Sequence, residues 1–227
     1  SGLPDFAQDE ARHRVEILED KDWEREWMQH YAPMQVGPRL WVCPSWIAPP
    51  APDAINLMLD PGLAFGTGTH PTTALCLARL DELSPADCTV VDYGCGSGIL
   101  ALAALKLGAS TCLGVDTDPQ ALVATRENAA RNAIPDEKLA AALPHEVDMA
   151  VWSQQADLVV ANILAGPLVE ISNTLLGFLK PGGTLLLSGL LHSQAPALCQ
   201  HYEDRIRLEV TGESEGWVCL QGNVAAS

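Results

Sequence analysis

Three closely spaced glycines, Gly94, Gly96 and Gly98, follow a run of β-branched residues and precede an apolar, helix-like stretch. A glycine-rich turn between a strand and a helix lets a ligand approach the backbone closely, as nucleotide-like ligands require. The spacing is G-x-G-x-G, and Ile99 occupies the position of the third glycine in the dinucleotide fingerprint G-x-G-x-x-G. This difference argues against a nicotinamide or flavin dinucleotide. The turn also lacks the Lys-Ser/Thr pair of a P-loop, which argues against a nucleoside triphosphate.

Two aspartates flank this turn and narrow the choice of ligand. Asp116 ends the next predicted strand, where a carboxylate can accept hydrogen bonds from both hydroxyls of a ribose. Asp92 ends the strand before the turn, where a negative charge suits a cationic ligand and would repel a pyrophosphate. The sequence therefore indicates a nucleoside with ribose hydroxyls, a cationic portion and no pyrophosphate. S-adenosylmethionine, with an adenosine, a sulfonium and an ammonium, has this chemistry.

Alternating strand and helix patterns must position these residues. Runs of Val and Leu with little alternation fit strands of a sheet that is covered on both faces, and they lie at 89–94, 111–118, 138–143, 156–163 and 183–191. Helical patterns lie between them, at 100–107, from Pro119 to about 132, and from Pro167 until Pro-Gly-Gly at 181–183 stops the helix. This alternation predicts an α/β fold with a doubly wound, Rossmann-like, mostly parallel sheet. The stretch 206–222 reads as two strands without a helix between them, which predicts a C-terminal antiparallel hairpin.

The region before the first strand differs in composition from the rest of the chain. Residues 1–30 are highly charged and predict a linker helix and lead-in segment, and 31–227 form the predicted catalytic domain. Prolines at 44, 49, 50 and 52 interrupt the backbone and predict irregular or edge structure there.

Composition limits the classes of partner. The 227 residues carry a net charge of −16, which disfavours direct binding to nucleic acid or to an anionic membrane and would attract a basic partner. The chain has no apolar run of membrane-spanning length and no signal peptide. Its seven cysteines form no C-x-x-C pair, which argues against a disulfide framework or a zinc site and fits a reducing cytoplasm.

Several segments resemble known methyltransferases. VVDYGCGSG (90–98) is similar to motif I of class I methyltransferases, and GVDTDPQAL (114–122) is similar to their second motif. Segments that resemble the narrower PrmA family, which methylates the ribosomal large-subunit protein L11, are LDPGLAFGTGTHPTTALCL (59–77), VVANILAGPL (159–168), LEDKDWEREWM (18–28) and RLWVCPSW (39–46). The likeness extends from about residue 15 to the end of the chain.

The resemblance implies a set of residues that bind S-adenosylmethionine. Thr73, Gly94, Asp116 and Asn162 match the cofactor contacts of the family, and Gly96 and Phe65 are expected beside them, with Asp92, as argued above, facing the positive charge of the cofactor. The glycine-containing loop before Pro71 is expected to fold over the cofactor, and the helix that starts at Pro71 presents N–H groups that can bind its carboxylate. His70, in the same loop, is either a base or, more in keeping with loop histidines, a structural residue.

Asn162 is the candidate for holding the acceptor amine. Presenting a lysine amine in its neutral form at pH 7 costs about 4–5 kcal/mol, and a dry site lowers the amine pKa. The Asn162 side-chain oxygen can accept an N–H of the amine without adding a negative charge, and the carbonyl of Ile163 or Leu164 can accept another. We therefore predict Asn162, Ile163 and Leu164 as the catalytic segment, with a strand-end turn as the structural alternative for Asn162.

The resemblance implies a protein N-methyltransferase that acts on lysine and N-terminal amines of the ribosomal protein. It also implies a substrate-capture domain upstream of this chain, without which the natural substrate is methylated poorly. Two alternatives stay open. One is another amino or amide methyltransferase, acting on a release-factor glutamine or a small amine, although the Asn-Pro-Pro-aromatic motif of that group is absent. The other is a fragment that only binds the cofactor.

Overall fold

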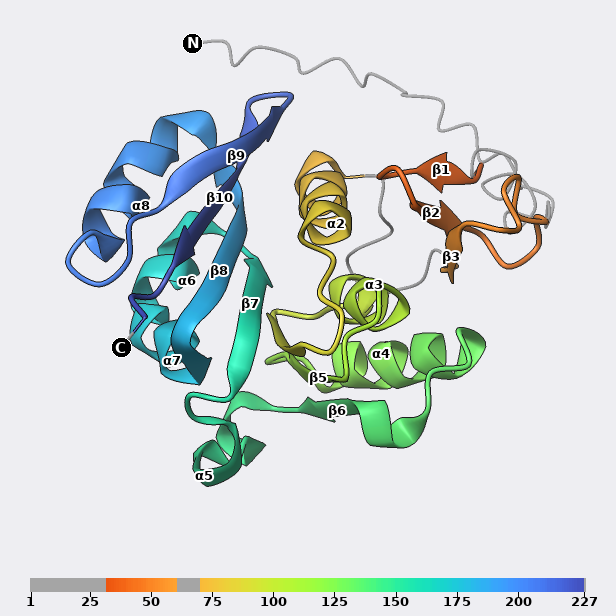
Figure 1. The fold of residues 1–227 in the computed structure, drawn as a ribbon, viewed down its shortest axis with the longest axis horizontal. Helices are drawn as coiled ribbons and strands as arrows, with labels where there is room; N and C mark the ends of the chain where they lie inside the picture. Colours follow the sequence, from red (N-terminus) through yellow and green to blue (C-terminus); the bar gives the residue numbers. More distant parts are fainter. Residues whose placement is uncertain (1–31, 61–69, 227) are drawn as a thin grey trace, which may run out of the picture. The chain divides into compact units, whose positions relative to one another are not determined.

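A computed structural model describes residues 32–60 and 70–226. Within them, the main body is a seven-stranded sheet of order β6-β5-β4-β7-β8-β10-β9 (Figure 1). Its strands are β4 (Thr89–Tyr93), β5 (Thr111–Val115), β6 (Leu139–Ala142), β7 (Ala156–Asn162), β8 (Leu179–Leu191), β9 (Glu209–Ser214) and β10 (Trp217–Asn223). The pairs from β6 to β8 are parallel, whereas β10 is antiparallel to both β8 and β9. The predicted doubly wound sheet and its C-terminal antiparallel hairpin are confirmed.

Helices cover both faces of this sheet. They are α2 (Pro71–Leu83), α3 (Ile99–Lys106), α4 (Pro119–Arg131), α5 (Met149–Trp152), α6 (Ala165–Glu170), α7 (Ser172–Phe178) and α8 (Ala195–Tyr202), with short 3₁₀ turns at Asp136–Lys138, Pro144–Glu146 and His192–Gln194. Figure 1 shows α2, α3 and α4 on one side of the sheet and α6, α7 and α8 on the other. Two clusters of buried hydrophobic side chains lie on the two faces of the sheet. Successive strand residues point to opposite faces, so Val90 packs in the first cluster and Val91 in the second.

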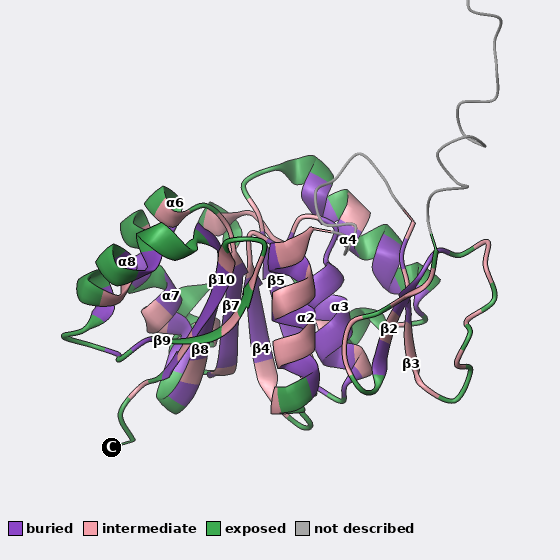
Figure 2. Cartoon of the chain, turned by 90° about the horizontal axis from the view of Figure 1, so that it is seen from above, coloured by how far each residue is buried: buried purple, intermediate pink, exposed green. Residues whose placement is uncertain are grey.

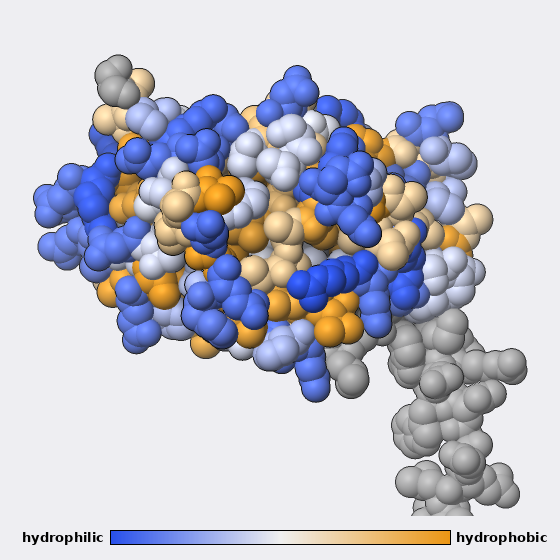
Figure 3. Space-filling model, turned by 90° about the horizontal axis from the view of Figure 1, so that it is seen from below, coloured by the Kyte–Doolittle hydropathy of each residue, from blue (hydrophilic) through white to orange (hydrophobic). Residues whose placement is uncertain are grey.

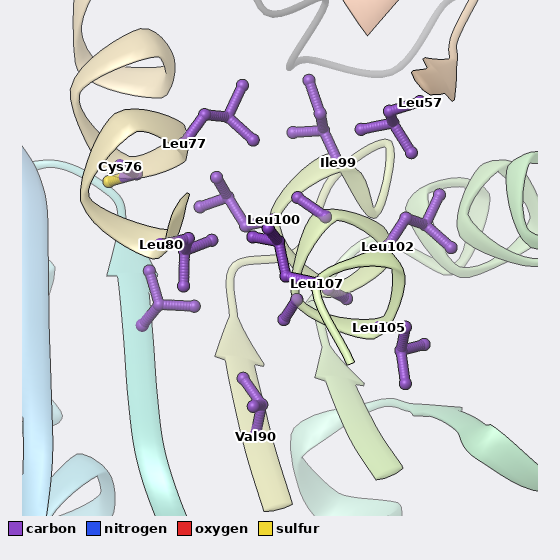
Figure 4. Close-up of a cluster of buried hydrophobic side chains, with 14 of the residues drawn as sticks. Leu57, Cys76, Leu77, Leu80, Val90, Ile99, Leu100, Leu102, Leu105 and Leu107 are labelled. Carbon is purple, nitrogen blue, oxygen red and sulfur yellow. The ribbon is translucent and has the colours of Figure 1, made fainter. Parts of the chain in front are cut away.

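The first of these clusters explains why α3 sits so firmly beside the glycine turn. Every residue of α3 from Ile99 to Leu105 is buried (Figure 2). Figure 4 shows side chains of α2 and α3 gathered in one cluster with Leu57. A helix that is apolar all round belongs in a core, so the turn that precedes α3 is attached to a rigid element.

The prediction of one helix, from Pro167 to the Pro-Gly-Gly, is wrong in two respects. The helix predicted from Pro167 to the Pro-Gly-Gly is two helices, α6 and α7, which meet at Ile171. The helix also ends at Phe178, before the Pro-Gly-Gly at 181–183, which lies inside β8. There the β7–β8 register shifts, because Ala156 pairs with Leu179 but Leu158 pairs with Thr184. The Pro-Gly-Gly is therefore accommodated as an irregularity of the strand and does not stop the helix.

A second, smaller sheet precedes α2 and was not predicted. Its strands are β1 (Met34–Gln35), β2 (Leu40–Cys43) and β3 (Ile55–Met58), and β2 and β3 are parallel. The proline-rich stretch between β2 and β3 is irregular, as predicted. Asn132, at the end of α4, holds β3 by accepting from the Met58 N–H and donating to the Met58 carbonyl. Helix α8 was not predicted either.

The surface of the described residues is mixed in character. On the face shown in Figure 3, hydrophilic side chains surround separate apolar areas. Among the helices of the described residues, none is long and apolar enough to cross a membrane. The linker helix predicted for 1–30 lies outside the described residues, as does the loop 61–69.

Candidate active site

The glycine turn between β4 and α3 has the backbone that its sequence predicts. Gly94, Gly96 and Gly98 have φ values of 82°, 53° and 79°, in the left-handed region that favours glycine. The amides of Gly94 and Cys95 donate to the Val115 carbonyl at the end of β5, at 2.7 and 3.1 Å. The turn is thus fixed to the neighbouring strand through its own backbone.

Asp116 follows β5 immediately and faces this turn. Its Oδ2 accepts from the Gly96 N–H at 2.9 Å, and its Oδ1 accepts from the Asp118 N–H at 3.0 Å. Asp118 in turn caps α4, whose first residue is Pro119, as predicted. Two backbone amides therefore fix the orientation of the Asp116 carboxylate, while each of its oxygens keeps a further lone pair. That carboxylate is partly exposed, so it can accept two more hydrogen bonds from a ligand.

Asp92 lies deeper than the sequence analysis expected. It is fully buried, and its Oδ2 accepts from the Ala101 N–H in the first turn of α3 at 3.0 Å. Among the buried side-chain polar atoms of the described residues, only its Oδ1 lacks a hydrogen-bond partner. Burial raises the pKa of Asp92 to about 7; the bond from Ala101 opposes this rise and the charge of Asp116 adds to it. A nearby cation would satisfy this carboxylate, but its contact with a ligand stays a prediction.

Asn162 and Thr73 meet although 89 positions separate them. Asn162 is the last residue of β7, and Thr73 is buried in the first turn of α2. The Asn162 Nδ2 donates to the Thr73 Oγ1 at 3.2 Å. This bond uses one of the two N–H groups of the amide and holds its orientation, and within the described part of the chain no donor to Oδ1 is found. The amide oxygen can therefore accept an N–H from outside the protein.

Two glycines, one in the turn after β4 and one in β8, lie close to Ile163, the residue after Asn162. A Cβ on Gly94 would overlap the Ile163 Cγ2 atom. A Cβ on Gly189 would overlap the Ile163 carbonyl oxygen and lie 2.6 and 2.9 Å from its carbonyl carbon and its nitrogen. The sequence analysis missed Gly189, although a glycine inside a strand pattern can signal close backbone approach.

Leu164 is less suited than Ile163 to its predicted role. Its carbonyl accepts from the Leu168 N–H at 3.2 Å in the first turn of α6, so one of its lone pairs is already occupied. Its side chain is 68% exposed, which places it at the rim. The acceptor role of either carbonyl stays a prediction.

His70 is the N-cap of α2. Its Nδ1 lies 2.7 Å from the Thr72 Oγ1 and accepts from the Thr72 N–H at 3.4 Å. Its ring stands edge-on to the ring of Trp217, with centroids 5.2 Å apart. These contacts favour the structural alternative for His70. Phe65, predicted as a cofactor neighbour, lies outside the described residues.

The strand order separates this sheet from that of the dinucleotide-binding proteins. Strand β10 runs antiparallel between β8 and the edge strand β9, so the sheet contains a reversed strand that an all-parallel Rossmann sheet does not have. This sheet also carries a glycine turn that lacks the third glycine of the dinucleotide fingerprint. An acidic residue, Asp116, follows its second parallel strand, β5. The fold and the site together define a class I methyltransferase.

Comparison with known proteins identifies the family. A model described as "Ribosomal protein L11 methyltransferase (PrmA)" matches residues 3–225, and the chain belongs to this family. The ribosomal protein L11 methyltransferase of Vibrio cholerae serotype O1 is 56% identical over 210 residues, which are 92% of this chain and 70% of that protein. The one from Serratia proteamaculans is 57% identical over 212 residues, 93% of this chain and 71% of that protein.

Solved structures agree with this assignment. A ribosomal protein L11 methylase from Lactobacillus delbrueckii subsp. bulgaricus superposes with a TM-score of 0.75 at 33% identity, covering 86% of this chain and all of that one. An RNA methyltransferase from Salinibacter ruber, solved in complex with S-adenosyl-L-homocysteine, superposes with a TM-score of 0.51 at 17% identity, covering 66% of this chain and 91% of that one. The second likeness concerns the fold alone.

Proposed function

We propose that this chain is an S-adenosylmethionine-dependent protein N-methyltransferase that moves methyl groups to lysine and N-terminal amines of ribosomal protein L11. The observation that carries the proposal is the Asn162 amide, which Thr73 holds beside the glycine turn with its oxygen left to accept. Membership of the L11 methyltransferase family supplies the substrate.

The residues present fit S-adenosylmethionine. Asp116 has lone pairs for a pair of ribose hydroxyls, and backbone amides fix its orientation. The Asp92 Oδ1 is buried without a partner, which suits a ligand that brings positive charge. The left-handed Gly94 and Gly96 leave the turn without side chains where a nucleoside would approach. When bound, the cofactor supplies a methyl group on a sulfonium, a leaving group that needs no further activation.

The protein must then align the acceptor and keep it neutral. An in-line displacement requires the amine nitrogen about 3–3.5 Å from the methyl carbon, opposite the sulfur. The Asn162 Oδ1 orients the amine by accepting one N–H, and it adds no charge that would hold the ammonium protonated. The Ile163 carbonyl is the better candidate to accept a second N–H of the amine, because the Leu164 carbonyl already accepts a hydrogen bond within α6. The proposal needs no general base, because a dry site lowers the pKa of the amine and so favours its neutral form.

The remaining predictions about partners belong to the same proposal. The net charge of −16 suits a basic protein substrate and disfavours direct contact with nucleic acid or an anionic membrane. A cytoplasmic location and a substrate-capture domain ahead of this chain stay predictions. A longer chain that includes such a domain is expected to methylate L11 faster than this one, and equal rates would refute that expectation.

The alternative is a methyltransferase for another amine or an amide, such as a release-factor glutamine. Asn162-Ile163-Leu164-Ala165 lacks the Asn-Pro-Pro-aromatic pattern of that group. The third candidate is a fragment that binds the cofactor without transferring its methyl group.

Two measurements separate these candidates. Calorimetry with S-adenosylmethionine and with NAD should show binding of the first and none of the second; the reverse would exclude a methyltransferase. Radiolabelled S-adenosylmethionine with purified ribosomal protein L11 should then label the protein. Label on a release-factor peptide but not on L11 would favour the alternative enzyme, and cofactor binding without any label would favour the binding fragment.

A further inference from the structure

Strand β8 carries a bulge at Ser188 and Gly189. On the neighbouring strand β10, Val218 pairs with Leu190 and Leu220 pairs with Leu187. Two residues of β8, Ser188 and Gly189, therefore lie opposite the single residue Cys219. Gly189 has a φ of 88°, in the left-handed region. A strand with one extra residue and a left-handed glycine is a β-bulge, a feature that re-aims groups beside active sites.

The bulge lies directly beside the acceptor segment. On its other side β8 pairs with β7, and the last pair joins Ser188 to Asn162. The next residue along each strand brings Gly189 against the backbone of Ile163. A Cβ at position 189 would overlap the Ile163 carbonyl oxygen and lie within 2.6 Å of its carbonyl carbon. All of these atoms are backbone, so a side chain at 189 could be accommodated only by a backbone shift that separates the bulge from the segment that carries Asn162.

Ser188 ties the same bulge to the helix that carries Thr73. It is fully buried, and its Oγ donates to the Val218 carbonyl at 2.9 Å, which anchors the bulge to β10. It also lies near Cys76 of α2, a helix that packs against β8. The pKa of Cys76 is raised well above its usual value, chiefly by its hydrogen bond with Cys219 and by burial, while Ser188 acts in the opposite direction. Cys76 lies about one helical turn beyond Thr73.

We propose that the Ser188–Gly189 bulge is a positioning element for methyl transfer, which sets the Ile163 backbone and thereby the direction of the Asn162 amide. The inference rests on the proposed function and deepens it. Gly189 of the bulge lies against Ile163, the residue after Asn162. Ser188 pairs with Asn162 itself and lies near Cys76, about one turn beyond Thr73. The bulge acts on the acceptor side of the site and leaves the Asp116 side unchanged.

The test compares two glycines of the same strand. Gly182 has a φ of 79°, close to that of Gly189, but a Cβ there would meet nothing within 4 Å. Gly182→Ala therefore carries the same backbone strain as Gly189→Ala without the overlap. We expect Gly189→Ala to lower kcat by about 100-fold, because small displacements of reacting groups have effects of that order. Its Kd for S-adenosylmethionine, by calorimetry, should stay at the wild-type value. Gly182→Ala should leave both quantities unchanged.

A second pair of variants tests which atoms of Ile163 are involved. The overlap at Gly94 is with the Ile163 side chain, whereas the overlap at Gly189 is with its backbone. Ile163→Ala should therefore restore part of the cofactor affinity lost in Gly94→Ala, but none of the kcat lost in Gly189→Ala. Recovery of kcat in the double variant Gly189→Ala/Ile163→Ala would overturn the inference.

The outcomes separate this inference from the proposed function. Equal kcat values for Gly189→Ala and Gly182→Ala, or a parallel loss of cofactor affinity in Gly189→Ala, would overturn the positioning role while leaving the enzyme assignment intact. If the wild-type chain labels no protein, the proposed function fails, and a crystal structure of Gly189→Ala decides the inference. An Ile163 carbonyl displaced from its wild-type position supports it, and an unmoved one overturns it.

Discussion

The two halves of the site are built by different means. In the cofactor half, the glycine turn and Asp116 are joined by backbone amides over a short stretch of sequence. In the acceptor half, Thr73, Asn162 and Gly189 come from α2, β7 and β8 and meet only in the folded chain. The first half depends on local backbone conformation and the second on the packing of three distant elements.

This difference predicts different responses to substitution. A change in the cofactor half should appear as a weaker Kd for S-adenosylmethionine, with kcat preserved once the cofactor saturates. A change at Gly189, which is not a predicted cofactor contact, should appear in kcat with the cofactor Kd preserved. Thr73 and Asn162 are predicted cofactor contacts as well, so a change at either should lower kcat by a larger factor than it weakens the cofactor Kd. If both kinds of change affected both quantities alike, the division of the site into two halves would be wrong.

The largest effect is expected from Asn162→Asp. Aspartate has nearly the same shape and can accept a hydrogen bond from the Thr73 hydroxyl, so the geometry is kept while a negative charge is added. That charge raises the pKa of the incoming ammonium and reduces its neutral fraction. We expect methyl transfer at pH 7 to fall by about 10²–10³-fold. In a pH series, the alkaline rise of the rate should move to higher pH.

Asn162→Ala is the matched control for charge. It removes the acceptor oxygen without adding a carboxylate, so its rate should fall while the pH at which the rate rises stays near that of the wild type. A profile that moves equally in both variants would show that Asn162 does not act through the protonation state of the amine.

The next effect concerns the cofactor half and is smaller. Asp116→Ala removes an acceptor from the Gly96 and Asp118 amides and from the predicted ribose hydroxyls. Hydrogen bonds to a charged group contribute about 1.5–3 kcal/mol each, so losing the two ribose bonds at the lower end of this range, about 3 kcal/mol together, should weaken the Kd by about 100-fold. Asp118→Ala, two positions away, removes an exposed carboxylate and the cap of α4, and it should lower stability without changing the Kd. Equal Kd values for the two variants would remove Asp116 from the cofactor site.

The same difference between the halves determines how much the sequence alone predicted. The glycine turn, the parallel strands and the position of Asp116 were predicted because each requirement is met within a few neighbouring residues. Asn162 was predicted from its place after an apolar strand. Its bond to Thr73 could not be, because it depends on how α2 packs on the sheet.

The errors have related causes. Pro-Gly-Gly at 181–183 is a strong local turn signal, but β8 continues through it, because Leu179 and Thr184 on either side of it both pair with β7. The helix of 167–178 was predicted whole because its apolar stripe continues across the break at Ile171. Gly189 interrupts a run of leucines, which can signal close backbone approach, but the sequence alone does not show that the approaching backbone is that of Ile163. Asp92 was placed correctly at the strand end, but its burial follows from the packing of α3.

Asp92→Asn gives a pH-dependent change of stability. The folded pKa of about 7 lies above the ordinary value of 3.8, so the folded state holds this proton more tightly than the unfolded state. The stability that this proton contributes is therefore full below pH 3.8 and is lost as the pH rises to 7. The full shift corresponds to about 4 kcal/mol. We expect the Asp92→Asn variant to gain about half of this above pH 7, since the new amide leaves its own N–H group unpaired.

Urea unfolding at pH 4 and pH 8 measures this change. The variant should be less stable than the wild type by about 1–2 kcal/mol at the lower pH, because its unpaired amide is not offset there, and more stable at the higher pH. Asp81→Asn is the control, because buried Asp81 accepts from the Arg39 Nε at 2.8 Å, and breaking that ion pair should lower stability at both pH values. The cofactor Kd should also weaken in Asp92→Asn if the carboxylate faces the charge of the ligand, and an unchanged Kd would restrict Asp92 to a structural role.

The smallest effect is expected from substitutions of His70, and it distinguishes a catalytic base from a helix cap. His70→Asn supplies one of the preferred capping side chains for α2, so both stability and kcat should stay near the wild-type values. His70→Ala should lower the free energy of unfolding by about 1 kcal/mol through loss of the cap. A general base at this position would give a different pattern, because both variants would then lose about 10²–10⁴-fold in rate. Rates of His70→Asn and His70→Ala, measured side by side at saturating cofactor, therefore distinguish the two roles. Equally large losses of rate in both variants would assign His70 to the acceptor half as a base.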